Sequence, residues 1–290
     1  MRSRLPAPGC SITTNRGSLR PLMPSCASSA CSRSGWARVR CCETDMWGLL
    51  DCTHYYYRFG QTIPILKDAT LAIEEHEKVA VLAPPGHGKT TIVRLLTGME
   101  SPESGRVLRC PDAWPLGYAG GFRPEMTAEN NIRSIAKMAG MNADELSAFV
   151  HDFSELGDAY YLPLLNYTNR MKARLGFGTC FGIPAKVYIA DDKLTGGEPA
   201  FREKCTRELE HRLQTSGLLC LTSNPRAVQD VCDRFYVMED GGFTACDDFE
   251  EAKEMLLYLL EEQDSLPLRS DVAAQRIDRD RDDLLFFDLA

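Results

Sequence analysis

The segment with the clearest chemistry runs from Ala83 to Thr91 and has the sequence Ala-Pro-Pro-Gly-His-Gly-Lys-Thr-Thr. A short apolar run rich in β-branched residues, 78–83, precedes it and predicts a buried strand. An apolar helical pattern follows it and ends at Gly98. A strand, a glycine-rich loop and a helix in this order are typical of a loop that binds nucleotide phosphates. The alternative is a structural turn between a strand and a helix.

Each residue type in this loop suits a contact with phosphate. Glycines such as Gly86 and Gly88 let backbone N–H groups approach phosphate oxygens, and Lys89 can reach the β- and γ-phosphates. The hydroxyl of Thr90 can ligate Mg²⁺, and the helix N-terminus adds a partial positive charge. Pro85 lacks an N–H group, so one possible donor is absent. The predicted phosphate-binding residues are Pro85, Gly86, His87, Gly88, Lys89, Thr90 and Thr91.

Segments with recognisable patterns surround this loop. They are Leu50–Tyr56, Leu66–Ile73, Thr97–Val107, Ala113–Phe122, Asn166–Leu175, Lys186–Asp192, Phe201–Cys205, Leu221–Pro225 and Val231–Met238. In this order and at this spacing they resemble the ATP-binding subunit of ABC transporters, over residues 46–263. The run Ala-Trp-Pro-Leu-Gly-Tyr-Ala-Gly-Gly-Phe, which ends at Phe122, resembles the branch that exports capsular polysaccharides and related cell-surface glycans.

The resemblance implies roles for residues outside the loop. Tyr56, 33 residues before Lys89, matches an aromatic residue that stacks on adenine; its residue type alone would favour a packed aromatic at a strand end. After the apolar strand 186–191, Asp191 would hold Mg²⁺ through water, and Asp192 would stand where a base polarises the attacking water. The alternative for these two carboxylates is a solvated acidic turn after a buried strand.

Five positions depart from the pattern of the family. Ala83 replaces the first glycine of the loop, and Arg123 replaces a glutamine that senses the γ-phosphate and the water. Arg170 replaces a signature glycine whose N–H touches the γ-phosphate on the opposite subunit. Asp192 replaces a glutamate, and Asn224 replaces a histidine. We predict Asp192, Asn224 and Arg123 as the catalytic residues and Arg170 as a further nucleotide contact.

These substitutions predict retained ATP binding with weakened hydrolysis. The side chain of Asp192 is one methylene shorter than that of glutamate. A carboxylate misplaced by about 1 Å from the water can cost about 10²-fold in rate. Asn224 exchanges hydrogen bonds but can neither take a proton nor carry a charge. Arg170 is bulky for a tight phosphate contact, although its charge can pair with phosphate. Thr90 and Asp191, the predicted Mg²⁺ ligands, are retained.

The placement of these segments predicts an α/β fold of the P-loop NTPase type with a mostly parallel core sheet. Strands near 47–57 and 65–74 would form an antiparallel β subdomain, and the strand at 78–83 would start the core sheet. Helical periodicity over 127–182 predicts a helical subdomain, and an apolar stripe over 249–259 predicts a last helix packed on the core. Further core strands are expected near 186–191, 218–222 and 234–238.

Composition divides the 290 residues into three segments. Residues 1–45 carry seven Arg and two acids without apolar periodicity. They are expected to be a disordered leader, either a targeting peptide or an over-extended start with translation beginning at Met46. Residues 46–263 form the expected ATP-binding domain, and residues 264–290 an expected disordered acidic tail. The twelve cysteines lack metal-site spacing, and those of the middle segment are expected to be buried thiols.

Charge and hydropathy limit the possible partners. A net charge of −8 argues against a nucleic-acid surface, and no run reaches the ~18 apolar residues of a membrane span, so direct membrane insertion is not expected. The resemblance implies an ATPase subunit at the cytoplasmic face of the inner membrane. It would pair with an integral-membrane permease and with a second ATP-binding subunit, either an identical copy or a paralogue. The alternative is a catalytically impaired module with a structural or regulatory role beside an active ATPase.

Overall fold

A three-stranded antiparallel sheet forms the first part of the fold in the computed structural model, which describes residues 46–58, 61–117 and 121–265. Its strands are β1 (Met46–Arg58), β2 (Gln61–Glu74) and β4 (Ser104–Leu108), in the order β2-β1-β4. This is the antiparallel β subdomain that the sequence predicted. The predicted leader, 1–45, lies outside the described residues, and so does the predicted tail, 264–290, except for its first two residues, which end the last helix, Phe249–Ser265. The domain boundaries therefore stay predictions.

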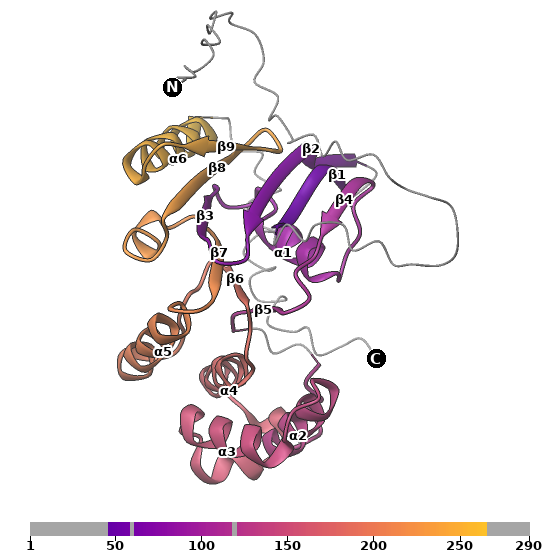
Figure 1. The fold of residues 1–290 in the computed structure, drawn as a ribbon, viewed down its shortest axis with the longest axis vertical. Helices are drawn as coiled ribbons and strands as arrows, with labels where there is room; N and C mark the ends of the chain where they lie inside the picture. Colours follow the sequence, from indigo (N-terminus) through magenta and orange to yellow (C-terminus); the bar gives the residue numbers. More distant parts are fainter. Residues whose placement is uncertain (1–45, 59–60, 118–120, 266–290) are drawn as a thin grey trace, which may run out of the picture. The chain divides into compact units, whose positions relative to one another are not determined.

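A six-stranded sheet forms the core, and five of its strands are parallel (Figure 1). In spatial order these strands are β5 (Ala113–Pro115), β6 (Val187–Asp191), β7 (Gly217–Thr222), β3 (Lys78–Leu82), β8 (Arg234–Glu239) and the antiparallel edge strand β9 (Gly242–Cys246). All six residues of β7 are buried, as expected for a parallel strand covered on both faces. The predicted α/β class with a mostly parallel core sheet is confirmed.

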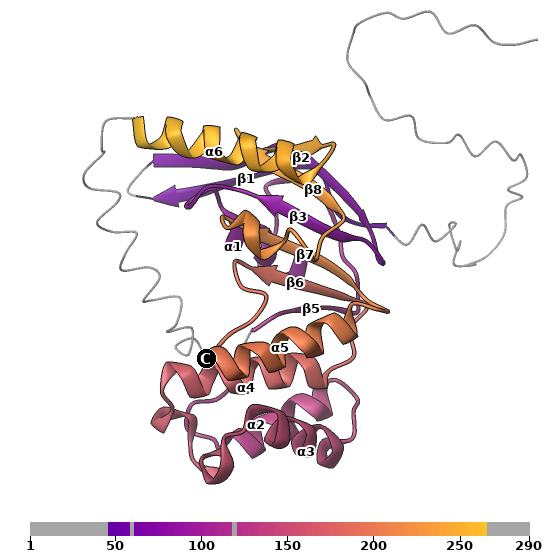
Figure 2. The same ribbon diagram turned by 90° about the vertical axis from the view of Figure 1, so that its left-hand side faces the viewer.

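Helices cover both faces of this sheet (Figures 1 and 2). Alternate residues of a strand point to opposite faces, and the two core clusters show this: Val79 packs with α1 (Lys89–Thr97), while Ala80 packs with residues of α5 (Pro199–Arg212) and α6 (Phe249–Ser265). On α6, Ala252 and Leu256 are fully buried, which confirms that the stripe predicted there packs on the core. A short 3₁₀ turn, Pro225–Ala227, follows β7.

The helices α2 (Ala128–Met138), α3 (Ala143–Ser154) and α4 (Asn169–Gly182) form the predicted helical subdomain around a third apolar cluster (Figure 2). Two 3₁₀ turns, Gly157–Tyr161 and Leu164–Asn166, connect α3 to α4. Thr168 caps α4 by accepting a hydrogen bond from the N–H of Met171, which satisfies one of the donors that a helix start leaves unpaired. Among the described residues, no helix combines the length and apolar character that a membrane crossing requires.

The seven cysteines in the described part of the chain are free thiols, and all but Cys246 are buried. Burial raises the pKa of Cys205 to about 11 and that of Cys232 to about 12, because the thiolate would lose its hydration. The described residues contain no group of three or more His, Cys, Asp or Glu side chains that could hold a metal ion together. The predicted burial of these cysteines is confirmed for six of the seven, and Cys246 is only partly buried.

Candidate nucleotide-binding site

The glycine-rich loop connects β3 to α1 and begins at the carboxyl end of the core sheet. The N–H of Ala83 donates to the carbonyl of Thr222, 3.0 Å away, so the loop leaves the sheet while still paired with β7. Gly88 has a φ of +84° and stands immediately before α1, and a Cβ there would lie 2.3 Å from the side chain of Ile65. Only glycine fits this position without strain. The helix that begins after it has no side-chain cap, so its first backbone N–H groups are available to an anion.

Lys89 is the buried cation of this loop, with 6% of its side chain exposed. Its Nζ donates to the carbonyl oxygens of Ala83 and Pro84, each 3.3 Å away, and lies 3.8 Å from Oδ2 of Asp192. A buried ammonium group needs such partners because it has lost its water. The loop is therefore closed around the lysine.

Thr90 and Asp191 bring two oxygen atoms together from distant parts of the chain. Thr90 Oγ1 donates to Asp191 Oδ2 over 2.6 Å, which joins the first turn of α1 to the end of β6. A hydroxyl and a carboxylate are the oxygen ligands that Mg²⁺ prefers, so this pair fits the predicted metal ligands. Both carboxylates predicted at the strand end lie at the carboxyl edge of the parallel sheet, beside the loop.

Asp192 adopts a left-handed backbone conformation, with φ at +61°, directly after β6. Its N–H donates to the carbonyl of Leu221 at 2.8 Å, and its Oδ1 accepts from the N–H of Ser223 at 3.0 Å. The bond to Leu221 therefore fixes the main chain of Asp192 against β7, and Ser223, the residue after β7, orients its carboxylate. The hydroxyl of Ser223 donates to the same oxygen over a longer distance, 3.5 Å. Ser223 is not among the residues predicted from the sequence, because its shorter contact comes from a backbone group, which carries no residue-type signal; adjacency to Asn224 was the only hint.

Asn224 makes its hydrogen bonds to neighbouring residues of the chain. Its Oδ1 accepts from the N–H of Arg226 at 3.2 Å and caps the 3₁₀ turn that follows β7, while its own N–H donates to Thr222 Oγ1 at 3.0 Å. Arg123 is held by its main chain: the buried side chain of Asn131 accepts from its N–H at 2.7 Å and donates to its carbonyl at 3.0 Å. These two bonds involve only the main chain of Arg123, which is an exposed residue.

Tyr56 and Arg170 lie on other elements. Tyr56 is half-buried on β1, in the antiparallel sheet, and packs against the apolar cluster that also holds α1. Arg170 is exposed in the first turn of α4 and lines a surface hollow whose other lining residues are Glu155, Leu156, Thr168, Met171, Arg174 and Glu198. The structure thus brings Lys89, Thr90, Asp191 and Asp192 together, whereas Arg170 belongs to the hollow at the start of α4.

Ion pairs hold the hollow at α4 together. Arg174 pairs with Glu198 and, at 3.2 Å, with Glu155. The carboxylate of Glu198 accepts a hydrogen bond from its own backbone N–H and a second one from Arg174, and both lower its pKa below the ordinary value. A hydrogen bond from Lys204 similarly lowers the pKa of Glu155. The carboxylates therefore stay charged into mildly acidic solution.

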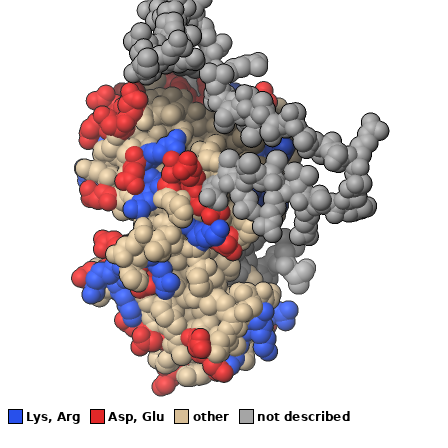
Figure 3. Space-filling view, viewed as in Figure 1, with Lys and Arg blue, Asp and Glu red and all other residues tan. Residues whose placement is uncertain are grey.

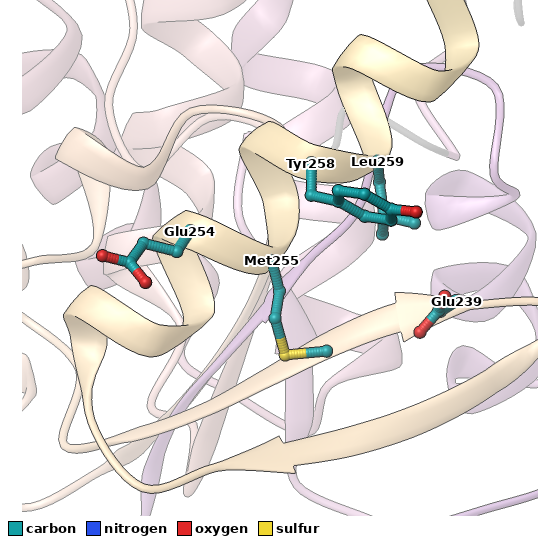
Figure 4. Close-up of a pocket in the computed structure, with 5 residues that line it drawn as sticks. All are labelled: Glu239, Glu254, Met255, Tyr258 and Leu259. Carbon is teal, nitrogen blue, oxygen red and sulfur yellow. The ribbon is translucent and has the colours of Figure 1, made fainter.

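A second surface hollow lies between α6 and the end of β8 and is lined by Glu239, Glu254, Met255, Tyr258 and Leu259 (Figure 4). None of these lining residues belongs to the predicted site. On the face shown in Figure 3, basic and acidic side chains of the described residues are interspersed.

Comparisons with known proteins agree with this geometry. The profile of the ABC transporter family matches residues 66–193. The ATP-binding protein BexA of Haemophilus influenzae is 32% identical over 202 residues, which cover 69% of this chain and 93% of that protein. The capsule polysaccharide export ATP-binding protein CtrD of Neisseria meningitidis serogroup B is 31% identical over 191 residues, covering 66% of this chain and 88% of that protein.

Solved structures show the same fold. The structure of an ATP binding subunit of an ABC transporter matches with a TM-score of 0.62 and 18% identity, covering 75% of this chain and 100% of that one. The dimeric post-hydrolysis state of the ATP-binding cassette MJ0796, bound to ADP and Pi, matches with a TM-score of 0.56 and 17% identity, covering 68% of this chain and 96% of that one. With the loop, the carboxylates and the relatives in agreement, the chain belongs to the ABC transporter family as an ATP-binding subunit.

Proposed function

We propose that the chain binds Mg²⁺-ATP at the carboxyl edge of its core sheet and thereby energises the export of a capsule-type polysaccharide. One observation carries the site: Lys89, Thr90, Asp191 and Asp192 meet there, although the chain separates the first pair from the second by about a hundred residues. The substrate class is supported by the names of relatives, among them CtrD and the polysialic acid transport ATP-binding protein KpsT of Escherichia coli.

Bound ATP would replace the contacts that now close the loop. The β- and γ-phosphate oxygens would take over Lys89 from the carbonyls of Ala83 and Pro84, and backbone N–H groups from Gly86 onward would face the phosphates. Thr90 and Asp191 would hold Mg²⁺, which neutralises charge on the phosphates when bound. The side chain of Tyr56 would stack on the adenine ring.

The site would be less suited to hydrolysing ATP than to binding it. Asp192 is oriented by Ser223 yet ends one methylene short of a glutamate, and Asn224 cannot carry a proton. Arg123 and Arg170 place cations where the family pattern has neutral residues. We infer that the site keeps its binding groups and hydrolyses ATP slowly.

The assembly would contain two ATP-binding subunits, either identical or paralogous, on a membrane permease. The dimeric MJ0796 cassettes of the same fold support pairing. Arg170 would then face the γ-phosphate of the opposite subunit, and the complex would sit on the cytoplasmic face of the inner membrane. The relatives do not favour the alternative of an impaired module beside an active ATPase, since CtrD and KpsT are named export and transport ATP-binding proteins.

Equilibrium binding of a fluorescent ATP analogue to the full chain tests the site assignment. Lys89→Ala should abolish measurable binding, because it removes the cation that faces the phosphates. The exposed Lys137→Ala on α2 is the matched control and should bind as the parent does. Equal binding by Lys89→Ala and the parent would show that the nucleotide is held elsewhere.

A further inference from the structure

The carbonyl groups of the glycine-rich loop point in two directions. The two that accept from Lys89 Nζ belong to Ala83 and Pro84, and the nitrogen of each of these peptides is a proline nitrogen. Neither peptide carries an N–H, so turning their carbonyls onto the lysine removes no donor from the loop. The first peptide after Ala83 that does carry an N–H is the one between Pro85 and Gly86.

The carbonyl of Pro85 has a different partner. It accepts a hydrogen bond from Nε2 of Gln263, 3.4 Å away, which lies 178 residues further along the chain on the last turns of α6. In a trans peptide the C=O and N–H bonds point in opposite directions across the same plane. A donor held on the Pro85 carbonyl from outside the loop therefore aims the N–H of Gly86 away from α6.

The position of Gln263 on α6 follows from helical periodicity. It lies seven residues after Leu256 and eleven after Ala252, so it continues the buried stripe of the helix. α6 runs back from β9 over the core sheet toward the edge where the parallel strands end (Figure 2). The apolar stripe thus ends in an amide at the point where the helix reaches the phosphate loop.

We propose that Gln263 is a positioning residue for nucleotide binding: by donating to the Pro85 carbonyl it holds the Gly86 N–H toward the phosphates of the bound nucleotide. The inference rests on the proposed function, since it takes the loop as the ATP site. It gives α6 a second role beyond packing. It also explains how a loop with two prolines retains its first available donor in a fixed direction.

Binding of ATP and of tripolyphosphate to the full-length chain tests this role, because tripolyphosphate contacts the loop without a base. Gln263→Met keeps the length of the side chain and removes the donor, whereas Gln263→Asn keeps the amide and retracts it by one methylene. Both variants should weaken both ligands roughly threefold to tenfold, because the Gly86 N–H would no longer be held in the direction of its one hydrogen bond to the phosphates. The melting temperature without ligand should stay at that of the parent. Gln214→Met, at an exposed glutamine after α5, is the matched control and should bind as the parent does.

Unchanged affinity for both ligands in the two Gln263 variants would overturn the inference. So would weakened binding that comes with a clear fall in melting temperature in both variants, because α6 would then act only through packing. Failure of the proposed function gives a different result: the parent would not bind ATP, or Lys89→Ala would bind it equally well. If the parent binds and Lys89→Ala does not, the Gln263 result concerns the positioning role alone.

Discussion

Thr90 Oγ1 donates to Asp191 Oδ2 across 2.6 Å, and this contact joins the helix after the phosphate loop to the strand that ends in two carboxylates. Parallel strands bring their carboxyl ends to one edge of a sheet, so β3 and β6 deliver the loop and the acids to the same place although β7 lies between them. The binding part of the site is therefore a consequence of strand order.

If adenine stacks on the ring of Tyr56, removal of that side chain should moderately weaken the affinity for ATP. Tyr56→Ala should weaken binding by about 1–3 kcal/mol, by analogy with nucleic-acid bases stacked on aromatic side chains. The neighbouring Tyr57 is 67% exposed and points to the other face of β1, so Tyr57→Ala is the matched control and should have little effect. Titration with a fluorescent ATP analogue measures both. Equal losses in the two variants would mean that the strand, and not the ring, supports binding.

The predicted leader should contribute nothing to the stability of the ATP-binding domain. Its Arg-, Ser- and Pro-rich composition offers little apolar surface to bury, so a chain beginning at Met46 should melt at the same temperature as one beginning at Met1. Differential scanning calorimetry of the two chains compares them. A fall of several degrees on truncation would show that residues 1–45 pack on the domain.

The ion pairs of Arg174 predict a pH-dependent contribution to stability. The pKa of Glu198 is lowered from an ordinary value of 4.5, and a carboxylate with a lowered pKa adds stability above that value and loses it as the pH falls through its folded value. Arg174→Met should therefore melt below the parent at pH 7, and the difference should narrow as the pH is lowered below the ordinary value of 4.5.

Thermal melts between pH 7 and pH 3 measure this difference. Arg207→Met is the control, because Arg207 is exposed on α5 and its nearest acid, Glu203, is 3.8 Å away. A difference between Arg174→Met and the parent that stays constant with pH would contradict the electrostatic account. It would instead assign the loss to the contact of Arg174 with the ring of Phe201, whose centroid lies 4.7 Å away.

Much of the fold was predictable because its signals are local. Buried parallel strands appear as short apolar runs, and α6 appears as a stripe in which Ala252 and Leu256 recur at helical spacing. Gln263 continues that stripe, yet its role depends on a contact with a carbonyl 178 residues away. Ser223 contacts Asp192 through its backbone N–H at 3.0 Å and through its hydroxyl only at 3.5 Å, and Asn131 bonds to the main chain of Arg123. Residue type alone therefore could not identify either.

Restoring the family pattern at four positions should restore turnover. Asp192→Glu alone should help little, because groups that act as a unit do not contribute additively. Combined with Asn224→His, Arg123→Gln and Arg170→Gly, it should raise the rate by about 10²-fold or more, since a single oriented acid or base typically contributes roughly 10²–10⁴-fold. No gain in the fourfold variant would assign the defect to the phosphate loop, where Ala83 replaces the usual glycine and Pro85 lacks an N–H group.

Steady-state ATP hydrolysis by the unmodified chain, measured beside ATP binding in the same Mg²⁺-containing buffer, tests the central claim most directly. Lys89, Thr90 and Asp191 are placed to hold Mg²⁺-ATP, whereas Asp192 and Asn224 are poorly suited to activate water. We expect saturable, Mg²⁺-dependent binding with phosphate release that is very slow or undetectable. Brisk hydrolysis at saturating ATP would contradict this account and would show that these residues support ordinary turnover.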